Sequence, residues 1–151
     1  MQVMHKAPYH ELLADRGQLS VARTLPIPLM SAIAAVAEAS LPELHFEGHW
    51  RRDATGPLGR SDLAAARVPA RLAARRSTAV ELELAPWSDH ECELVVRPAG
   101  RAPHRWSARR RARWYAVAHA LADALRQQLL ATPHARRMVP IQVAARTRLA
   151  G

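Results

Sequence analysis

The chain has 151 residues, of which 49% are hydrophobic but only 5% aromatic, and it fits a single domain over 1–151 with a core of small side chains. It contains no apolar run of the roughly 18 residues that a membrane span needs, no apolar segment of a secretory signal near its start, and no second cysteine to pair with Cys92. We therefore expect a cytoplasmic protein without a membrane span or a disulfide.

The formal net charge of +9 favours an anionic partner. Two features weaken this interpretation. Only Lys6 is a lysine among the 22 basic residues, and a chain rich in Ala, Arg and Pro is what a GC-rich genome encodes without any partner. The arginines are also spread over most of the chain instead of gathered in one tail. A nucleic-acid partner is therefore the less favoured alternative.

Proline, glycine and apolar patterning divide the first half of the chain into short elements. We expect residues 1–8 to be a loose start. The predicted elements that follow are a helix over 9–16 that ends at Gly17, a strand over 18–25, a helix over 29–39 led by Pro28, a strand over 45–52 with a bulge at Gly48, and a strand over 63–75. In the last strand Pro69 indicates a sheet edge or a bulge, because proline has no N–H to donate to a neighbouring strand.

A β-hairpin is the clearest feature of the middle of the chain. Apolar residues alternate with glutamates over 78–84 and again over 91–97, which is the period of a strand with one buried face. The residues between them, 85–90 (APWSDH), predict the turn.

A long helix over 107–131 is the firmest element of the sequence. Ser107 is a good N-cap, apolar residues recur at steps of three and four, and Pro133 follows the end of the pattern. Residues 139–151 form a tail that either adds a short strand (IQVAA) or stays mobile.

A strand, a Pro-led helix, antiparallel strands and a long C-terminal helix follow one another, and this order predicts an α+β fold. The stretches that carry the pattern are QLSVARTLPIP with LMSAIAAVAEA, TAVELELAPWSDHECELVVRP, and SARRRARWYAVAHALADALRQQLL. In this pattern the chain resembles the SRPBCC (START-like, polyketide-cyclase-like) superfamily. The resemblance implies a helix-grip fold, in which a curved antiparallel sheet wraps around the C-terminal helix. We count about five strands, which is a reduced number for this family.

The resemblance also implies a cavity between sheet and helix that holds a hydrophobic or amphipathic small molecule and, in some members, an enzyme activity. The residues expected to face this cavity are Trp114, Val117, Ala118, Leu121 and Leu125 of the helix, Leu82, Leu84, Cys92 and Leu94 of the hairpin, and Trp87 of its turn. We expect Trp87, Trp106 and Trp114 to meet around one end of the helix, either as core packing or as the wall of an apolar pocket.

Arg109, Arg110, Arg111 and Arg113 crowd the first turns of the long helix. Positive charge there opposes the helix dipole, so these arginines together with the free N–H groups of the helix end are candidates to bind an anion. RNA, DNA or a phosphate-bearing ligand would bind through them and through Arg75 and Arg76. The alternative is that acidic residues (Asp89, Glu91 or Glu43) neutralise them, or that water solvates them.

Two rows of charge are expected on the outer face of the sheet. The rows are Arg67, Arg71 and Arg75, and Glu81, Glu83, Glu91 and Glu93. Adjacent antiparallel strands place such rows side by side, which favours cross-strand ion pairs over a metal site built from the glutamates. The histidines have no metal-ligand spacing either, so we expect neither a metal nor a cofactor.

No catalytic residue is assigned from the sequence. Cys92 lies in the middle of a strand on its apolar side, where a thiol stays protonated and inert. His119 and Asp123 are one helical turn apart and are expected to form an exposed pair. A homodimer through a sheet edge near Pro69 or through the glutamate face is a further alternative.

Overall fold

The structure is a computed structural model that describes residues 19–54, 60, 64–73, 78–100, 105–131 and 141–144. The predicted loose start, the predicted helix over 9–16 and most of the predicted tail lie outside the described residues. Within them, two helices and one sheet form an α+β fold, as predicted.

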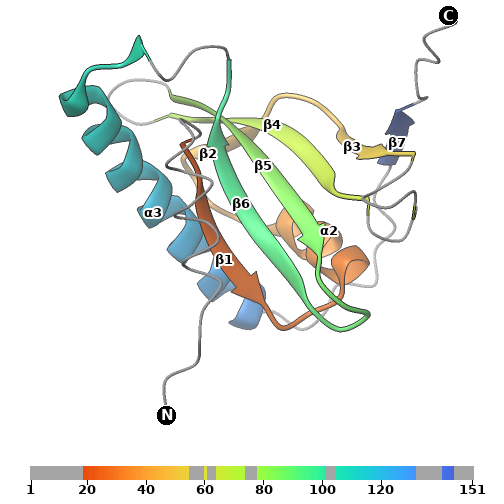
Figure 1. Cartoon of the computed structure of the whole chain (residues 1–151). Coiled ribbons are helices and arrows are strands. Elements are labelled where there is room, and N and C mark those ends of the chain that lie inside the picture. Colours follow the sequence, from red (N-terminus) through yellow and green to blue (C-terminus); the bar gives the residue numbers. More distant parts are fainter. Residues whose placement is uncertain are drawn as a thin grey trace, which may run out of the picture.

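Seven strands of the described chain form one open sheet (Figure 1). They are β1 (Val21–Leu25), β2 (Leu44–Phe46), β3 (Trp50–Asp53), β4 (Ala66–Leu72), β5 (Thr78–Pro86), β6 (Cys92–Pro98) and β7 (Ile141–Ala144). The order across the sheet is β1-β6-β5-β4-β3-β7, and β2 also pairs with β4. β3 and β7 are parallel, and the other described pairs are antiparallel. The sheet therefore has more strands than the sequence predicted, and the short strand in the tail is one of them.

The predicted hairpin is confirmed as β5 and β6. Leu82 lies opposite Val96 and Leu84 opposite Leu94, so the apolar residues of both strands share one face. Alternate residues of a strand point to the same side of the sheet, and the residues on this side are fully buried.

The strand predicted over 45–52 is interrupted. Phe46 lies opposite Ala70 and Arg51 opposite Arg67. Between these two pairs the chain moves on by five residues from β2 to β3 but by only three along β4. Gly48 lies in the resulting bulge, where a Cβ atom would come within 3.1 Å of the Pro69 ring. A large side chain has no room there, which explains the glycine.

Pro69 lies in a central strand and not at a sheet edge. Its carbonyl accepts a hydrogen bond from the Glu47 N–H at 2.9 Å, so this side of Pro69 faces the bulge. The N–H that proline lacks would point to the same side, because both backbone groups of a residue in an antiparallel strand face one neighbour. Of the two predicted explanations, the bulge is confirmed and the edge is wrong.

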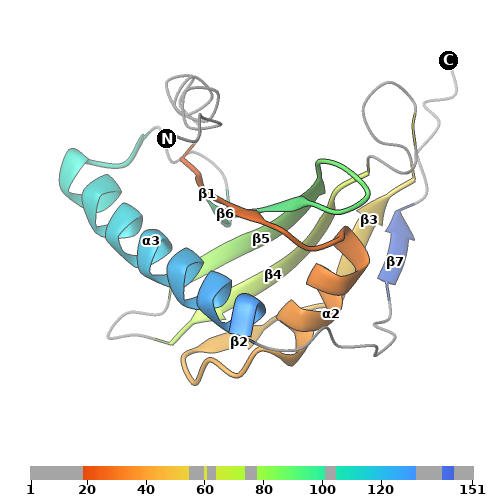
Figure 2. The same cartoon turned by 90° about the horizontal axis from the view of Figure 1, so that it is seen from below.

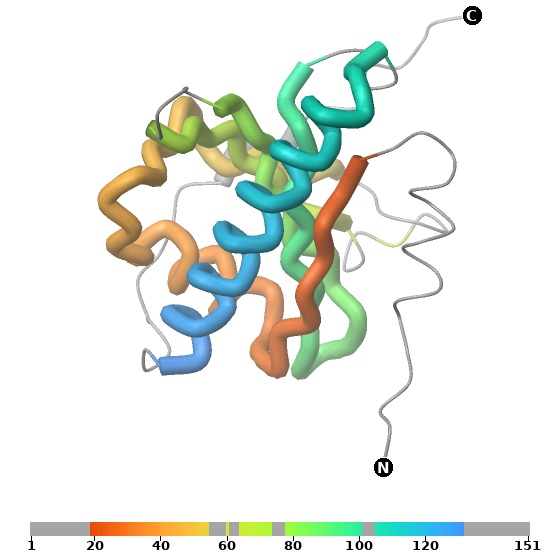
Figure 3. Tube along the Cα trace, turned by 90° about the vertical axis from the view of Figure 1, so that its left-hand side faces the viewer, coloured from red at the N-terminus to blue at the C-terminus, as the bar shows by residue number. Residues whose placement is uncertain are grey.

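Two helices cover the same face of the sheet (Figure 2). α2 (Leu29–Glu38) begins after Pro28, whose carbonyl accepts the Ala32 N–H at 2.9 Å. α3 (Ala108–Ala131) begins after Ser107, whose Oγ accepts the Arg110 N–H at 3.2 Å, which confirms the predicted N-cap. α3 runs along β1 and β6, and α2 packs on β5 and on α3 (Figure 3). Neither helix is long and apolar enough to cross a membrane.

One hydrophobic core lies between this helical layer and the sheet. α3 contributes a stripe of buried residues at helical spacing: Trp114, Ala118, Leu121, Ala122, Leu125 and Leu129. α2 adds Ile33 and Val36, and the sheet adds the inward residues of β1, β4, β5 and β6.

Candidate functional site

Nine of the ten residues predicted to face a cavity lie in the core between the two helices and the sheet. Eight of them are buried, and Val117 is half-buried and packs against the others. The eight are Leu82, Leu84, Cys92, Leu94, Trp114, Ala118, Leu121 and Leu125. Helix periodicity and strand alternation thus place these residues together as the sequence indicated.

Trp87 is the tenth residue and lies elsewhere. It belongs to the β5–β6 connection, at the end of the sheet away from the start of α3 (Figure 1). The residue is 46% exposed, and its Nε1 donates a hydrogen bond to Glu93 Oε2 at 2.8 Å. Glu93 alternates with Cys92 and Leu94, so this hydrogen bond forms on the outer face of the sheet.

The predicted meeting of three tryptophans is therefore wrong. Trp106 lies just before α3, where the guanidinium carbon of Arg110 sits 4.2 Å from the centre of its ring. Trp114 contacts Tyr115 edge to face, with ring centres 5.5 Å apart. Trp87 is absent from this group because it lies in the β5–β6 connection at one end of the sheet, whereas the chain leaves β6 and enters α3 at the other end.

The indole N–H of Trp114 is an unusual feature of the buried layer. The residue is 4% exposed, and its Nε1 has no hydrogen-bond partner among the residues that the structure describes. A buried donor without an acceptor costs about 1–3 kcal/mol, so such groups are rare and call for an explanation. Trp114 is thus a polar group that faces an otherwise apolar layer.

Arg111 lies one helical turn before Trp114 and is half-buried on the same side of α3. Its Nε is also buried without a hydrogen bond, although the residue makes other contacts. This side of α3 therefore changes from apolar to polar toward the start of the helix.

Arg23 connects β1 to the side of α3. Its Nε donates to Asp123 Oδ1 at 2.8 Å, and its Nη2 lies 2.9 Å from His119 Nδ1. Arginine can only donate, so His119 Nδ1 is the acceptor of this hydrogen bond. The hydrogen bond and charge of Arg23 lower the pKa of the Asp123 carboxyl below its ordinary value. The predicted exposed pair on α3 is thus part of a contact between helix and edge strand.

Sequence reasoning missed Arg23, although a signal for it exists. Val21, Arg23 and Leu25 alternate along β1, so the arginine occupies an inward position between two buried residues. A charged residue in an inward position of a strand requires a partner, and α3 supplies one. Arg126 adds a second contact by donating from Nε to the Thr24 carbonyl at 3.2 Å.

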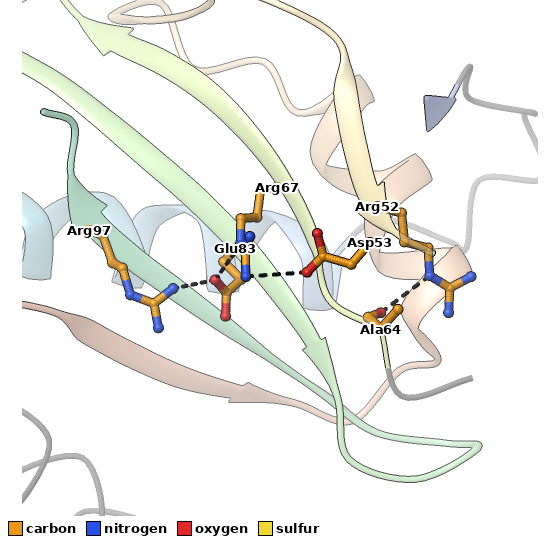
Figure 4. Close-up of polar contacts among 6 residues, drawn as sticks. All are labelled: Arg52, Asp53, Ala64, Arg67, Glu83 and Arg97. Atoms are coloured by element: carbon orange, nitrogen blue, oxygen red, sulfur yellow. Dashed lines mark hydrogen bonds and ion pairs between the residues drawn. The ribbon is translucent and has the colours of Figure 1, made fainter. Parts of the chain in front are cut away.

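The outer face of the sheet carries the predicted cross-strand ion pairs in part. The Glu83 carboxylate, 8% exposed as a residue, accepts hydrogen bonds from Arg67 Nε at 2.9 Å and from Arg97 (Figure 4). Arg67 Nη2 also lies 3.5 Å from Asp53 Oδ2. Burial lowers the pKa of Arg67, but the hydrogen bond and charge of Glu83 outweigh it and raise that pKa.

The other members of the two predicted rows are arranged differently. Arg71 pairs with Glu47, which precedes the bulge, and not with a glutamate of the hairpin. Glu93 holds Trp87, and Glu91 is exposed at the end of the β5–β6 connection. Arg75 lies outside the described residues.

Four arginines were predicted to bind an anion together. Arg109, Arg110 and Arg113 are exposed and Arg111 is half-buried. Successive residues of a helix are about 100° apart, so Arg109 and Arg113 share one face of α3, while Arg110 and Arg111 leave the axis in other directions. The four side chains therefore do not converge on one point. Among the described residues, no ion pair joins Asp89, Glu91 or Glu43 to any of them.

The described residues contain no group of three or more His, Cys, Asp or Glu side chains placed to hold a metal ion. Cys92 is a free, fully buried thiol. Buried apolar surroundings keep a thiol protonated, so it is not placed to act as a nucleophile.

No protein-family model matches this chain, and no curated protein is similar to it. The fold and the side chains described above are therefore the basis for assigning a function.

Proposed function

We propose that the protein is a helix-grip protein related to the SRPBCC superfamily, and that it binds a hydrophobic or amphipathic small molecule between α3 and the sheet. The layout supports the first part. β1 pairs with β6, α2 lies between β1 and β2 in sequence, and the long α3 follows the last antiparallel strand and packs on the sheet.

The buried N–H of Trp114 is the observation that carries the second part. It lies in a layer of leucine, valine and alanine side chains, and its Nε1 finds no acceptor among the described residues. A bound molecule with a carbonyl, carboxylate or ether oxygen would satisfy this donor and recover about 0.5–1.5 kcal/mol. The surrounding side chains would contact the apolar part of the same molecule. The proposed ligand is therefore apolar with at least one hydrogen-bond acceptor, and the proposed site of action is the cytoplasm.

A dye-binding titration with a matched pair of variants tests this proposal. Anilinonaphthalene sulfonate is a suitable probe, because it is amphipathic and fluoresces when it leaves water. We expect saturable binding to the native protein and displacement by a long-chain carboxylate. Trp114→Phe keeps an aromatic ring but removes the N–H, and we expect it to weaken displacement by the carboxylate by about two- to tenfold, the equivalent of one lost hydrogen bond.

Trp50→Phe is the control. Trp50 is as buried as Trp114, at 4% exposure. It lies in β3, however, and β5 and β4 separate β3 from β6, one of the two strands along which α3 runs. We expect this variant to bind the probe and the carboxylate as the native protein does. A buried water would satisfy the Trp114 N–H as well as a ligand does. In that case Trp114→Phe and Trp50→Phe would behave alike, and the proposal would be wrong.

A further inference from the structure

The segment that leads into α3 and its first two turns form an exposed surface of arginines, consisting of Arg105, Arg109, Arg110 and Arg113. None of these four makes an ion pair with a described carboxylate. The ion pairs described above are instead formed by arginines on the strands: Arg23, Arg67, Arg71 and Arg97. This surface therefore keeps its positive charge.

The sequence explains why the charge is not neutralised locally. No Asp or Glu occurs between Glu93 and Asp123, a stretch that contains seven arginines. The first turns of α3 also extend past the sheet, away from the carboxylates of its outer face (Figures 1 and 3). Positive charge at the start of a helix opposes the helix dipole, so the fold bears this arrangement at some loss of stability.

The arrangement of the charges indicates what they fit. Arg109 and Arg113 are one helical turn apart, a rise of about 6 Å, and share one face of α3. Arg110 lies on another side, with its guanidinium over the Trp106 ring at 4.2 Å. The charges are spread along a surface instead of converging on a point, which suits a partner with repeated negative charges better than a single small anion.

The surroundings of this surface argue against a membrane. The large hydrophobic side chains that the described residues expose are Met30, Trp87 and Leu130, and all three lie outside it. Binding at a lipid surface depends on apolar side chains that enter the bilayer beside the basic ones. A phosphate backbone needs only the arginines, which donate pairs of hydrogen bonds to phosphate oxygens.

We propose that Arg105, Arg109, Arg110 and Arg113 bind the phosphate backbone of a nucleic acid. The helix end itself is not the binding group, because Ser107 already accepts the Arg110 N–H. This site is separate from the one proposed around Trp114, so either proposal can fail alone.

Fluorescence anisotropy with a labelled oligouridine tests the proposal through the salt dependence of the affinity. Four arginine–phosphate contacts to a single strand give a slope of about −2.8 in log K against log salt, so the affinity falls about fiftyfold between about 50 and 200 mM salt. The variant Arg109→Gln/Arg113→Gln loses two contacts. We expect its slope to be shallower by about 1.4, which reduces the fall to about sevenfold. A duplex of equal length is the second probe, and binding of either form supports the proposal.

Arg51→Gln/Arg71→Gln is the matched control, because it removes the same net charge from exposed positions on β3 and β4. We expect it to keep the native slope. The proposal is overturned if neither nucleic acid binds at the lower salt concentration, or if the two double variants bind alike. Binding of polyglutamate in place of both nucleic acids would also overturn it, in favour of an acidic protein partner.

Discussion

The substitution Glu83→Gln tests the energetic importance of the ion pairs on the outer face of the sheet. Glu83 is 8% exposed, and its carboxylate accepts from two arginines on neighbouring strands. Glutamine keeps the size of the side chain but removes its charge and turns one acceptor oxygen into a donor. Both arginines donate to the same oxygen, Oε2, so the glutamine carbonyl can still accept from both, but as a neutral acceptor.

The expected loss follows from the number of bonds and the exposure of the partners. A hydrogen bond to a charged group contributes about 1.5–3 kcal/mol when it is buried. The side chains of Arg67 and Arg97 are 44% and 32% exposed, so water replaces part of what they lose. We expect the free energy of unfolding to fall by about 2 kcal/mol. For a chain of this size that is a decrease of about 4–8 °C in Tm.

Urea unfolding followed by tryptophan fluorescence measures this loss, with Glu81→Gln as the control. Glu81 lies on the same strand and the same face, and makes no ion pair with a described residue. We expect its substitution to change the free energy of unfolding by less than about 0.5 kcal/mol, with the m value unchanged in both variants. Equal midpoints for Glu83→Gln and Glu81→Gln would refute the reasoning.

Two further predictions concern α3. The pKa of Asp123 is lowered by Arg23, so this pair stabilises the fold above the unfolded-state pKa of about 4, and the contribution is lost as the pH falls through the lower folded-state value. The difference in the free energy of unfolding between the native protein and Asp123→Asn should therefore be constant near neutral pH and vanish in acid. A series of urea titrations at different pH values measures this difference. A difference that persists in acid would contradict the pairing. Leu125→Ala should cost about 2–5 kcal/mol because that side chain is fully buried in the core. Leu130 is 45% exposed on the same helix, so Leu130→Ala should change the free energy of unfolding by less than about 0.5 kcal/mol. Similar thermal midpoints for Leu125→Ala and Leu130→Ala would show that α3 is not packed as described.

Local patterns were sufficient to predict the elements that have one buried and one exposed face. Alternation along 78–84 and 91–97 placed Leu82, Leu84 and Leu94 on the inward face, because burial of one face imposes a period of two. The recurrence of apolar residues from Trp114 to Leu125 defined the buried stripe of α3 in the same way.

Features that depend on contacts between distant segments were not predictable from these patterns. The bulge was predicted from Gly48 itself, but the contact of that residue with the Pro69 ring across the sheet was not, because nothing near Gly48 in sequence specifies it. The position of Trp87 depends on which end of the sheet the β5–β6 connection occupies, which is a matter of topology. Alternation along β1 marks Arg23 as an inward charge, but it does not identify its partners, His119 and Asp123, which are about a hundred residues away.

That separation also has a consequence for synthesis on the ribosome. β1 is the first described strand, yet its neighbours in the fold are β6 and α3, which are made last among the larger elements. A nascent chain that has emerged only as far as β5 holds β1 with both of its edges unpaired. We expect truncated products that end before Cys92 to aggregate, and complete chains to fold slowly for their size, because the contacts that fix β1 span most of the polypeptide.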